Sequence, residues 1–256
     1  MKKSSFNLNN KNILITGGSG FLGSQIVDAF INEQSNVYII DVKKPKKKNS
    51  TKYFRSDITN EEDLKIILNY FKKKKLRIDV LINNAAIDYS PKKSKNNNLR
   101  LENFSNDLWE KDLSVSLKGS YLCTKIFGSY MSKIKKGVIL NVSSDLGIIA
   151  PDQRIYKKSN FIKPVTYSVV KHGIIGLTKY TAAYWGKKNI RCNAIAPGGM
   201  FNDQDKSFVK KINKLIPLGR MAKKKEYNGL ILFLCSDLSS YLTGSILVAD
   251  GGRTII

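Results

Sequence analysis

Short apolar runs alternate with longer amphipathic patterns along nearly the whole chain. Runs with the length and β-branched content of buried strands occur at residues 11–16, 36–41, 78–83, 137–143, 190–196 and 245–249. Helical spacing is found at residues 21–34, 61–74, 105–134, 167–185 and 226–235, and Ser105 is a candidate helix cap. Strands that alternate with helices pair in parallel and are covered on both faces. We therefore expect an α/β fold with a doubly wound parallel sheet of about seven strands.

Length and composition fit one domain of this kind over residues 1–256. A chain of 256 residues can bury a full α/β core, and 42% hydrophobic residues is an ordinary globular value. No repeat or interdomain linker divides the chain. Two stretches are irregular: residues 89–101, expected to be a surface loop, and residues 151–164.

The net charge of +24 comes from lysine runs scattered between the expected elements. We interpret these runs as solvated faces, with attraction of anionic substrates as the alternative. They form no nucleic-acid-binding motif, so we do not expect a nucleic acid partner. No apolar run reaches the roughly 20 residues that span a membrane, and none follows the basic N-terminus as in a signal peptide. We therefore expect a cytoplasmic protein.

Cysteine and histidine are scarce. The cysteines Cys123, Cys192 and Cys235 are widely spaced and odd in number, which predicts core packing rather than disulfides. With His172 as the single histidine, no metal site is expected.

A glycine-rich loop joins the first expected strand to the first expected helix. Its glycines allow a tight turn and the close approach of a pyrophosphate, which the free N–H groups of the helix N-terminus attract. Asp41 ends the second expected strand, where a carboxylate binds ribose hydroxyls and repels a 2′-phosphate. This favours NAD over NADP, and Lys43 and Lys44 soften the preference. The predicted dinucleotide loop comprises Gly17, Ser19, Gly20, Phe21, Leu22 and Gly23.

Tyr167 and Lys171 lie four residues apart on an expected helix and are therefore neighbours on one face. An ammonium group stabilises a phenolate, so we expect the pKa of Tyr167 to lie below its ordinary value of about 10. Such a tyrosine exchanges a proton with a substrate hydroxyl or carbonyl near neutral pH.

Taken together, these motifs resemble the short-chain dehydrogenase/reductase family over nearly the whole chain. The resemblance includes the Tyr-x-x-x-Lys spacing and the glycine loop, and it extends to Asp57-Ile58, Asn83-Asn84-Ala85, Val142-Ser143-Ser144, Asn193 to Pro197-Gly198, and Asp250-Gly251-Gly252. It implies a single-domain Rossmann-type fold with NAD or NADP as cofactor. The cofactor contacts it implies beyond the loop are Asp41, Asp57, Ile58, Asn83, Ala85, Tyr167, Lys171, Pro197 and Gly198.

The resemblance also implies catalytic roles. Tyr167 is the expected general acid/base, Lys171 the residue that binds the nicotinamide ribose, and Ser144 the residue that holds the reacting oxygen, with Ser143 as the fallback. Ser116 stands where the family usually has an asparagine that holds a water of the proton relay. Because serine is shorter, this relay is either kept through a water or slowed.

The substrate side is expected in two segments. Residues 151–164 are an insertion between Ser144 and Tyr167, and we expect Gln153 and Arg154 there to contact substrate; a surface loop at a subunit interface is the alternative. Residues 198–222 form the expected substrate loop. Both segments are similar to bacterial dehydrogenases linked to flagellin modification and acidic-sugar biosynthesis. That similarity implies a sugar or sugar-phosphate, with an anionic group bound by Arg154 or Arg220.

The leading hypothesis is thus hydride transfer between NAD(P) and a secondary alcohol or ketone. A 3-oxoacyl-thioester reductase and a non-catalytic dinucleotide-binding regulator remain alternatives. The glycine spacing resembles that of extended nucleotide-sugar epimerases, but a length of 256 residues leaves no room for their additional C-terminal substrate region. A homotetramer or homodimer is expected, with residues 105–134 and 167–185 at the interface.

Overall fold

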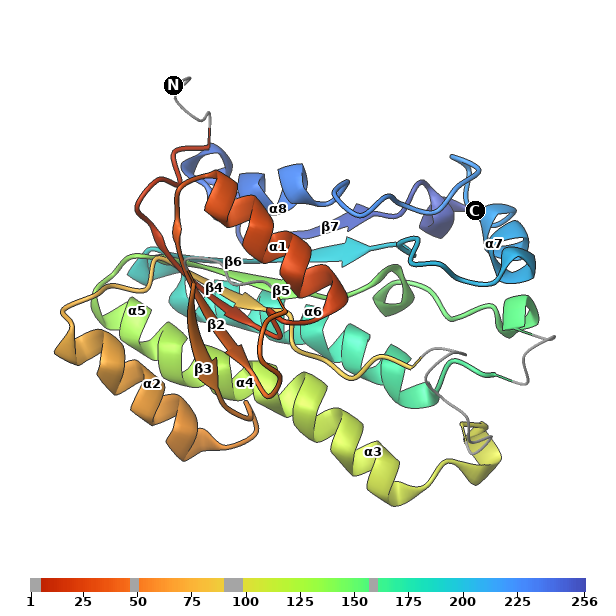
Figure 1. Ribbon diagram of the computed structural model, residues 1–256, viewed down its shortest axis with the longest axis horizontal. Coiled ribbons are helices and arrows are strands. Elements are labelled where there is room, and N and C mark those ends of the chain that lie inside the picture. Colours follow the sequence, from red (N-terminus) through yellow and green to blue (C-terminus); the bar gives the residue numbers. More distant parts are fainter. Residues whose placement is uncertain (1–5, 47–50, 90–98, 157–160) are drawn as a thin grey trace.

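The computed structural model describes residues 6–46, 51–89, 99–156 and 161–256. Its strands form one sheet in the order β3-β2-β1-β4-β5-β6-β7, and every neighbouring pair is parallel (Figure 1). The chain winds outward from β1 to β3, then crosses back to β4 and winds to β7, as in a Rossmann-type sheet. The strands are β1 (Asn12–Thr16), β2 (Asn36–Asp41), β3 (Lys52–Arg55), β4 (Val80–Asn83), β5 (Gly137–Val142), β6 (Ile190–Pro197) and β7 (Ile246–Ala249).

Helices cover both faces of the sheet (Figure 1). The helices α1 (Phe21–Asn32) and α8 (Asn228–Cys235) pack on one face, and α2 (Glu61–Lys73), α4 (Gly119–Cys123), α5 (Ser129–Lys133) and α6 (Val165–Trp185) on the other. Side chains of β1 alternate between the two layers: Ile13 and Ile15 enter the first, and Leu14 enters the second. The three cysteines are free and buried in these layers, as predicted.

The expected helix over residues 105–134 is confirmed, and two π-helical segments interrupt it. It runs through α3 (Asn106–Asp112), η2 (Leu113–Lys118), α4, η3 (Thr124–Gly128) and α5, and η2 and η3 are the π-helical parts. The Ser105 hydroxyl caps α3 by accepting the Leu108 N–H at 3.3 Å. Because π turns often occur at functional sites, the position of Ser116 within η2 is notable.

One strand and one α-helix of the described residues lie outside the predicted set. The edge strand β3 is half-exposed, so it lacks the continuous apolar run of a central strand. The helix α7 (Lys206–Asn213) occupies the middle of the expected substrate loop and packs on the segment at η5 (Gln153–Tyr156). Most of the irregular stretch at residues 89–101, expected to be a surface loop, lies outside the described residues. Residues 157–160 of the insertion also lie outside them.

The parallel strands bring their carboxyl ends to one edge of the sheet. The glycine loop follows β1, Asp41 ends β2, Ser144 follows β5, and Pro197 ends β6. Ligands of doubly wound sheets bind at this edge, near the point where the winding reverses between β1 and β4. In the part of the chain that the structure describes, no helix combines the length and apolar character needed to cross a membrane.

Candidate active site

The glycine loop after β1 is too tightly packed to take side chains. Gly17 has φ +67°, and a Cβ there would lie 2.7 Å from the Cα of Ala85. A Cβ on Gly23 would lie 2.1 Å from the Gly17 carbonyl oxygen. Asn84 braces the loop by donating from its Nδ2 to the carbonyls of Thr16 at 3.1 Å and Gly17 at 3.0 Å. The loop is therefore a rigid backbone turn.

The outer side of this turn fits a dinucleotide. Gly20 is the N-cap of α1, and among the described residues no side chain caps that helix, so its first N–H groups are available to a pyrophosphate. The Asp41 carboxylate accepts the N–H groups of Ser19 and Lys43, both at 2.9 Å. Because a carboxylate has about four acceptor positions, Asp41 retains capacity for ribose hydroxyls.

The other predicted cofactor residues have different surroundings. Asp57 accepts both the N–H and the hydroxyl of Thr59 at 2.9 Å, and Ile58 packs on Gly119, where a Cβ would be 2.4 Å from the Ile58 Cδ1. Pro197 ends β6, and the backbone of Gly198 after it is held by the Ala249 carbonyl and the Tyr227 hydroxyl.

Asn83 does not lie against the glycine loop. It is buried, and its Nδ2 donates to Thr124 Oγ1 at 3.0 Å and Asn141 Oδ1 at 2.8 Å, so it joins the sheet to η3. The next residue, Asn84, is the one that holds the loop, because successive residues leaving a strand point to opposite sides. The contact between Asn83 and the cofactor stays a prediction, and its side-chain amide donors are already used by Thr124 and Asn141.

Ser144, Tyr167 and Lys171 converge at the carboxyl end of β5. Ser144 is buried directly after the strand, and its hydroxyl is hydrogen-bonded to Tyr167, which stands in the first turn of α6. Ser143 is engaged elsewhere, because its hydroxyl donates to the Lys171 carbonyl at 2.8 Å. The geometry thus favours Ser144 over the fallback Ser143 as the serine that faces the phenol.

The prediction of a lowered pKa for Tyr167 is wrong for the protein without cofactor. Burial raises the pKa of Tyr167 above its ordinary value, the charges of Asp88 and Asp145 raise it further, and the Ser144 hydrogen bond lowers it in part. Lys171 does not offset this, because its Nζ donates to the Val142 carbonyl at 2.9 Å and lies 5.7 Å from the Tyr167 ring centroid.

Lys171 itself is strongly perturbed. Burial lowers its pKa to about 8, Asp88 opposes this, and the positive charge of Lys163 adds to it. A buried lysine whose pKa lies near neutrality is typical of functional sites.

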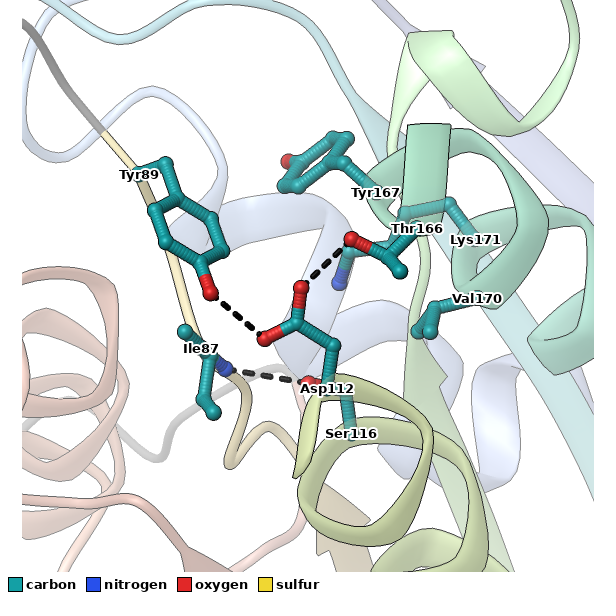
Figure 2. A pocket seen from close by; sticks show the side chains of 8 residues that line it. All are labelled: Ile87, Tyr89, Asp112, Ser116, Thr166, Tyr167, Val170 and Lys171. Atoms are coloured by element: carbon teal, nitrogen blue, oxygen red, sulfur yellow. Dashed lines mark hydrogen bonds between the residues drawn. The ribbon is translucent and has the colours of Figure 1, made fainter. Parts of the chain in front are cut away.

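A small cavity lies beside these residues (Figure 2). The Ser116 hydroxyl accepts the Ile87 N–H at 3.0 Å, and the buried Asp112 carboxylate accepts the hydroxyls of Tyr89, at 2.8 Å, and Thr166. The cavity volume is about 10 Å³, close to the minimum for one water molecule. Its lining is Ile87, Tyr89, Asp112, Ser116, Thr166, Tyr167, Val170 and Lys171.

The insertion brings a lysine, rather than its predicted residues, to the phenol. Arg154 is 79% exposed and forms a bidentate pair with Asp152. Gln153 brackets the backbone of Lys163 with hydrogen bonds of 2.9 and 3.0 Å. The Lys163 ammonium lies 3.8 Å from the Tyr167 ring centroid and 2.8 Å from the carboxylate of Asp88.

Sequence reasoning missed Asn84, Asp88, Asp112 and Lys163 as parts of this site. Asn84 belongs to the Asn83-Asn84-Ala85 motif, which was recognised in the sequence. The position of Asn83 as the last residue of a strand was the available signal that Asn84 points to the other side, toward the glycine loop. Lys163 precedes Pro164 and stands in no motif. In a chain with so many lysines, nothing in the sequence distinguishes it from those on the surface. Within the described ranges, no three His, Cys, Asp or Glu side chains gather as metal ligands.

Comparison with known proteins agrees with this geometry. Residues 20–254 match the model of a family described as enoyl-(acyl carrier protein) reductase, one of the short-chain dehydrogenase/reductase models. The chain belongs to the short-chain dehydrogenase/reductase family. Since the match spans nearly all described elements, the chain is an NAD(P)-dependent oxidoreductase of this family.

Relatives within the short-chain dehydrogenase/reductase family differ in substrate. An NAD-dependent glycerol dehydrogenase of Listeria innocua is 30% identical, with 98% of this chain and 96% of that protein covered. A 3-oxoacyl-[acyl-carrier-protein] reductase of Thermotoga maritima is 32% identical, with 97% and 99% covered. A short-chain dehydrogenase of Leptospira borgpetersenii, solved with bound NAD⁺, is 33% identical with a TM-score of 0.87, and 96% of this chain and 94% of that one are covered.

Proposed function

We propose that this oxidoreductase transfers a hydride between NAD and a secondary alcohol or ketone of a small polyhydroxylated compound, a sugar or polyol. The convergence of Ser144, Tyr167 and Lys171 beside the glycine loop carries the proposal. Ser144 holds the reacting oxygen, Tyr167 exchanges the proton with it, and Lys171 binds the nicotinamide ribose. The nicotinamide supplies or accepts the hydride when it is bound.

The cofactor contacts follow from the same edge of the sheet. The N–H groups of Phe21 and Leu22 bind the pyrophosphate. Gly17, Ser19, Gly20 and Gly23 shape the turn, within which the Gly20 N–H donates to the Gly17 carbonyl at 3.1 Å. Asp57, Ile58 and Ala85 line the adenosine side, and Pro197 and Gly198 form the wall at the nicotinamide. Lys171 would hold the nicotinamide ribose, and its ammonium group would lower the pKa of Tyr167 on coming closer to the phenol.

NAD is preferred over NADP in this proposal. The Asp41 carboxylate is fixed by two backbone N–H groups and stands where a 2′-phosphate would approach. The Asp41 carboxylate and the 2′-phosphate of NADP are both negative and repel each other. Lys43 and Lys44 are exposed beside it and reduce the preference without providing a fixed phosphate site.

The pairing of the candidate anion-binding side chains favours a neutral polyol over an anionic sugar. Arg154, Arg220 and Lys163 are each paired with a carboxylate, those of Asp152, Glu226 and Asp88. An anionic substrate group has to displace one of these carboxylates. The similarity to a glycerol dehydrogenase supports a polyol, and the sequence resemblance to acidic-sugar dehydrogenases makes sugar phosphates the second group to test.

A 3-oxoacyl-thioester reductase is the second candidate. It is favoured by 32% identity to a protein with that name over almost the full length. The position of Asp41 argues against the NADPH preference expected of that reaction. A non-catalytic regulator binds cofactor and turns over no substrate, so the same assay separates it.

The test is a panel read by NADH or NADPH absorbance. NAD⁺ and NADP⁺ are each offered with glycerol, threitol, gluconate and sugar phosphates, and NADPH and NADH with an acetoacetyl thioester. We expect the highest kcat/KM with NAD⁺ and a neutral polyol or sugar. Faster reduction of the thioester with NADPH contradicts the proposal and favours the second candidate. Cofactor binding without turnover of any compound favours the regulator.

We further propose that the protein works as a homotetramer or homodimer in the cytoplasm. The rings of Tyr180 and Tyr184 on α6 stack with their centroids 5.7 Å apart, and the two residues are 67% and 66% exposed. A pair of exposed aromatic rings of this kind is unusual for a surface that faces only water. The three buried thiols suit a reducing compartment. Light scattering of the purified protein measures the subunit number, and a monomer that is fully active contradicts the assembly.

A further inference from the structure

The side chain that follows Ser144 is a buried carboxylate, and its partner comes from the C-terminus. The Ser144 hydroxyl donates to Asp145 Oδ1 at 2.8 Å. The other oxygen, Oδ2, accepts from Arg253 Nη1 at 2.7 Å. The side chains of Asp145 and Arg253 are only 4% and 6% exposed. A chain of contacts therefore runs from Ser144 through Asp145 to Arg253, which lies 108 positions after Asp145 in the sequence.

The backbone on both sides fixes this chain of contacts. Asp145 opens η4 (Asp145–Gly147), where Leu146 donates its N–H to the same Oδ1 at 2.8 Å. Arg253 opens η8 (Arg253–Ile255) after Gly252, whose φ is +90°. Asp250 holds that turn by accepting the N–H groups of Gly252 at 2.9 Å and Thr254 at 2.7 Å. Both charged groups are thus presented by short, well-tied turns.

A buried ion pair is a costly way to stabilise a fold, because apolar residues of the same volume do as well or better. Its position next to Ser144 suggests a role in the site. We propose that Asp145 and Arg253 are positioning residues for the reaction: Asp145 fixes the orientation of the Ser144 hydroxyl, and Arg253 holds and neutralises Asp145. The C-terminal segment after β7 is then part of the catalytic apparatus. This inference rests on the proposed roles of Ser144 and Tyr167.

The pair acts on Ser144 through geometry. With its proton directed to Asp145 and one lone pair accepting the Leu146 N–H at 3.2 Å, the Ser144 oxygen has one lone pair left for the phenol or for a substrate hydroxyl. Without Asp145 the hydroxyl rotates among several acceptors. The expected result is a lower kcat with little change in KM, because the orientation matters most when the reacting oxygen changes its charge.

The pair also sets a charge beside Tyr167. The Asp145 charge raises the pKa of the phenol, and Arg253 neutralises it. The other charged or titratable groups that act on this site or on the pair are Asp88 after β4, Asp152 before η5, Tyr156 on η5, Lys163 before α6, Lys171 on α6, and Tyr227 before α8. All six are retained when only the pair is changed, so a change in the pH profile reports the pair.

The experiment measures alcohol oxidation with NAD⁺ as a function of pH, using the panel compound of highest turnover. Asp145→Asn removes the negative charge, and we expect its profile to move to lower pH. Arg253→Met leaves that charge uncompensated, and we expect its profile to move to higher pH by about one pH unit. Both lower kcat by about 10- to 100-fold, the loss expected for a hydrogen bond to a charged group. Arg253→Lys restores most of the rate.

Two further variants separate positioning from general stability. Arg77→Met breaks the Arg77–Asp79 pair, which lies at the start of β4 and away from the site, and serves as the matched control for losing an ion pair. Its pH profile stays in place even where its Tm falls. In a Ser144→Ala background, Asp145→Asn has little further effect on kcat, because the group that it orients is gone.

The outcomes are distinguishable. If Ser144→Ala and Tyr167→Phe retain full activity, or if the wild type turns over no compound, the proposed function is wrong and the inference falls with it. If those two variants are inactive but Asp145→Asn and Arg253→Met behave like Arg77→Met, only the positioning role is overturned. Shifts of the two profiles in the same direction also contradict it. An Arg253→Met protein that does not fold leaves Asp145→Asn and Arg253→Lys to decide.

Discussion

The ammonium of Lys163 lies 3.8 Å from the centroid of the Tyr167 ring, over the face of the phenol proposed to exchange the substrate proton. Its other contacts are the Asp88 carboxylate at 2.8 Å and the Tyr89 carbonyl at 3.2 Å. The lysine side chain is only 10% exposed, so the cation–π contact is largely desolvated and worth up to about 2 kcal/mol. The inserted segment therefore restrains Tyr167 through a contact with the face of its ring.

Removing this lysine is expected to affect the reaction and not cofactor binding. We predict that Lys163→Met lowers kcat/KM for the alcohol by roughly tenfold, as the loss of a desolvated cation–π contact implies, with an unchanged Kd for NADH. Lys163→Arg keeps the cation and retains most of the activity. Steady-state kinetics and fluorescence titration measure the two quantities. Equal kinetics for Lys163→Met and wild type would show that the contact has no role in the reaction.

The carboxylate at the end of β2 is predicted to decide between the two nicotinamide cofactors. Asp41→Ala removes the acceptor for Ser19 and Lys43 and should weaken NADH binding by about 10- to 100-fold. Asp41→Asn keeps an acceptor but removes the charge, so NADPH gains more than NADH loses. Fluorescence titration of both cofactors checks this. A wild-type protein that binds NADPH more tightly would mean that the neighbouring lysines dominate.

The glycine loop is expected to fail when a single methyl group is added at its tightest point. Gly23→Ala places a Cβ 2.1 Å from the Gly17 carbonyl oxygen, so the loop has to move and both Tm and NADH affinity should fall. Gly229→Ala is the matched control, since it lies in α8 with open space around the new Cβ. There alanine favours the helix by about 0.5–1 kcal/mol, and Tm should rise slightly. The same Tm for both variants would contradict the packing described for the loop.

The pKa of Lys171 predicts a particular pH dependence of stability. Burial lowers that pKa from 10.5 to about 8, so between these values the unfolded chain binds a proton that the folded protein has lost. Stability attributable to Lys171 therefore rises as the pH increases from about 8 toward 10.5, by roughly 3 kcal/mol in all. Below pH 8 both states hold the proton, and this contribution has no slope.

The difference between wild type and Lys171→Met isolates that contribution. Other groups that titrate in alkaline solution, including the buried cysteines, are common to both proteins. We expect the Tm of the wild type relative to the variant to increase across this window when cofactor is absent. A constant difference would show that Lys171 keeps an ordinary pKa in the folded protein.

The parts of this site that could be predicted are local in the sequence. The glycine loop is contiguous, and the Tyr167–Lys171 pair depends only on helical spacing. Strand register decides which of the adjacent residues Asn83 and Asn84 faces the loop, and a one-residue choice of this kind is beyond a sequence pattern. The half-exposed β3 has too short an apolar pattern to be recognised as a strand. The Asp145–Arg253 contact joins a residue just after β5 to a residue just after β7. These residues are far apart in the sequence, so only the fold reveals the contact.

The most direct test of the proposed mechanism is the initial rate of NAD⁺ reduction by Tyr167→Phe, compared with wild type on the panel compound of highest turnover. Phenylalanine keeps the ring beneath Lys163 and removes only the hydroxyl that exchanges the proton. We predict that the rate falls by about 10²- to 10⁴-fold, the usual contribution of a general acid or base, while NADH binds with unchanged affinity. A Tyr167→Phe protein that retains its rate would contradict the assignment of this phenol as the group that exchanges the substrate proton.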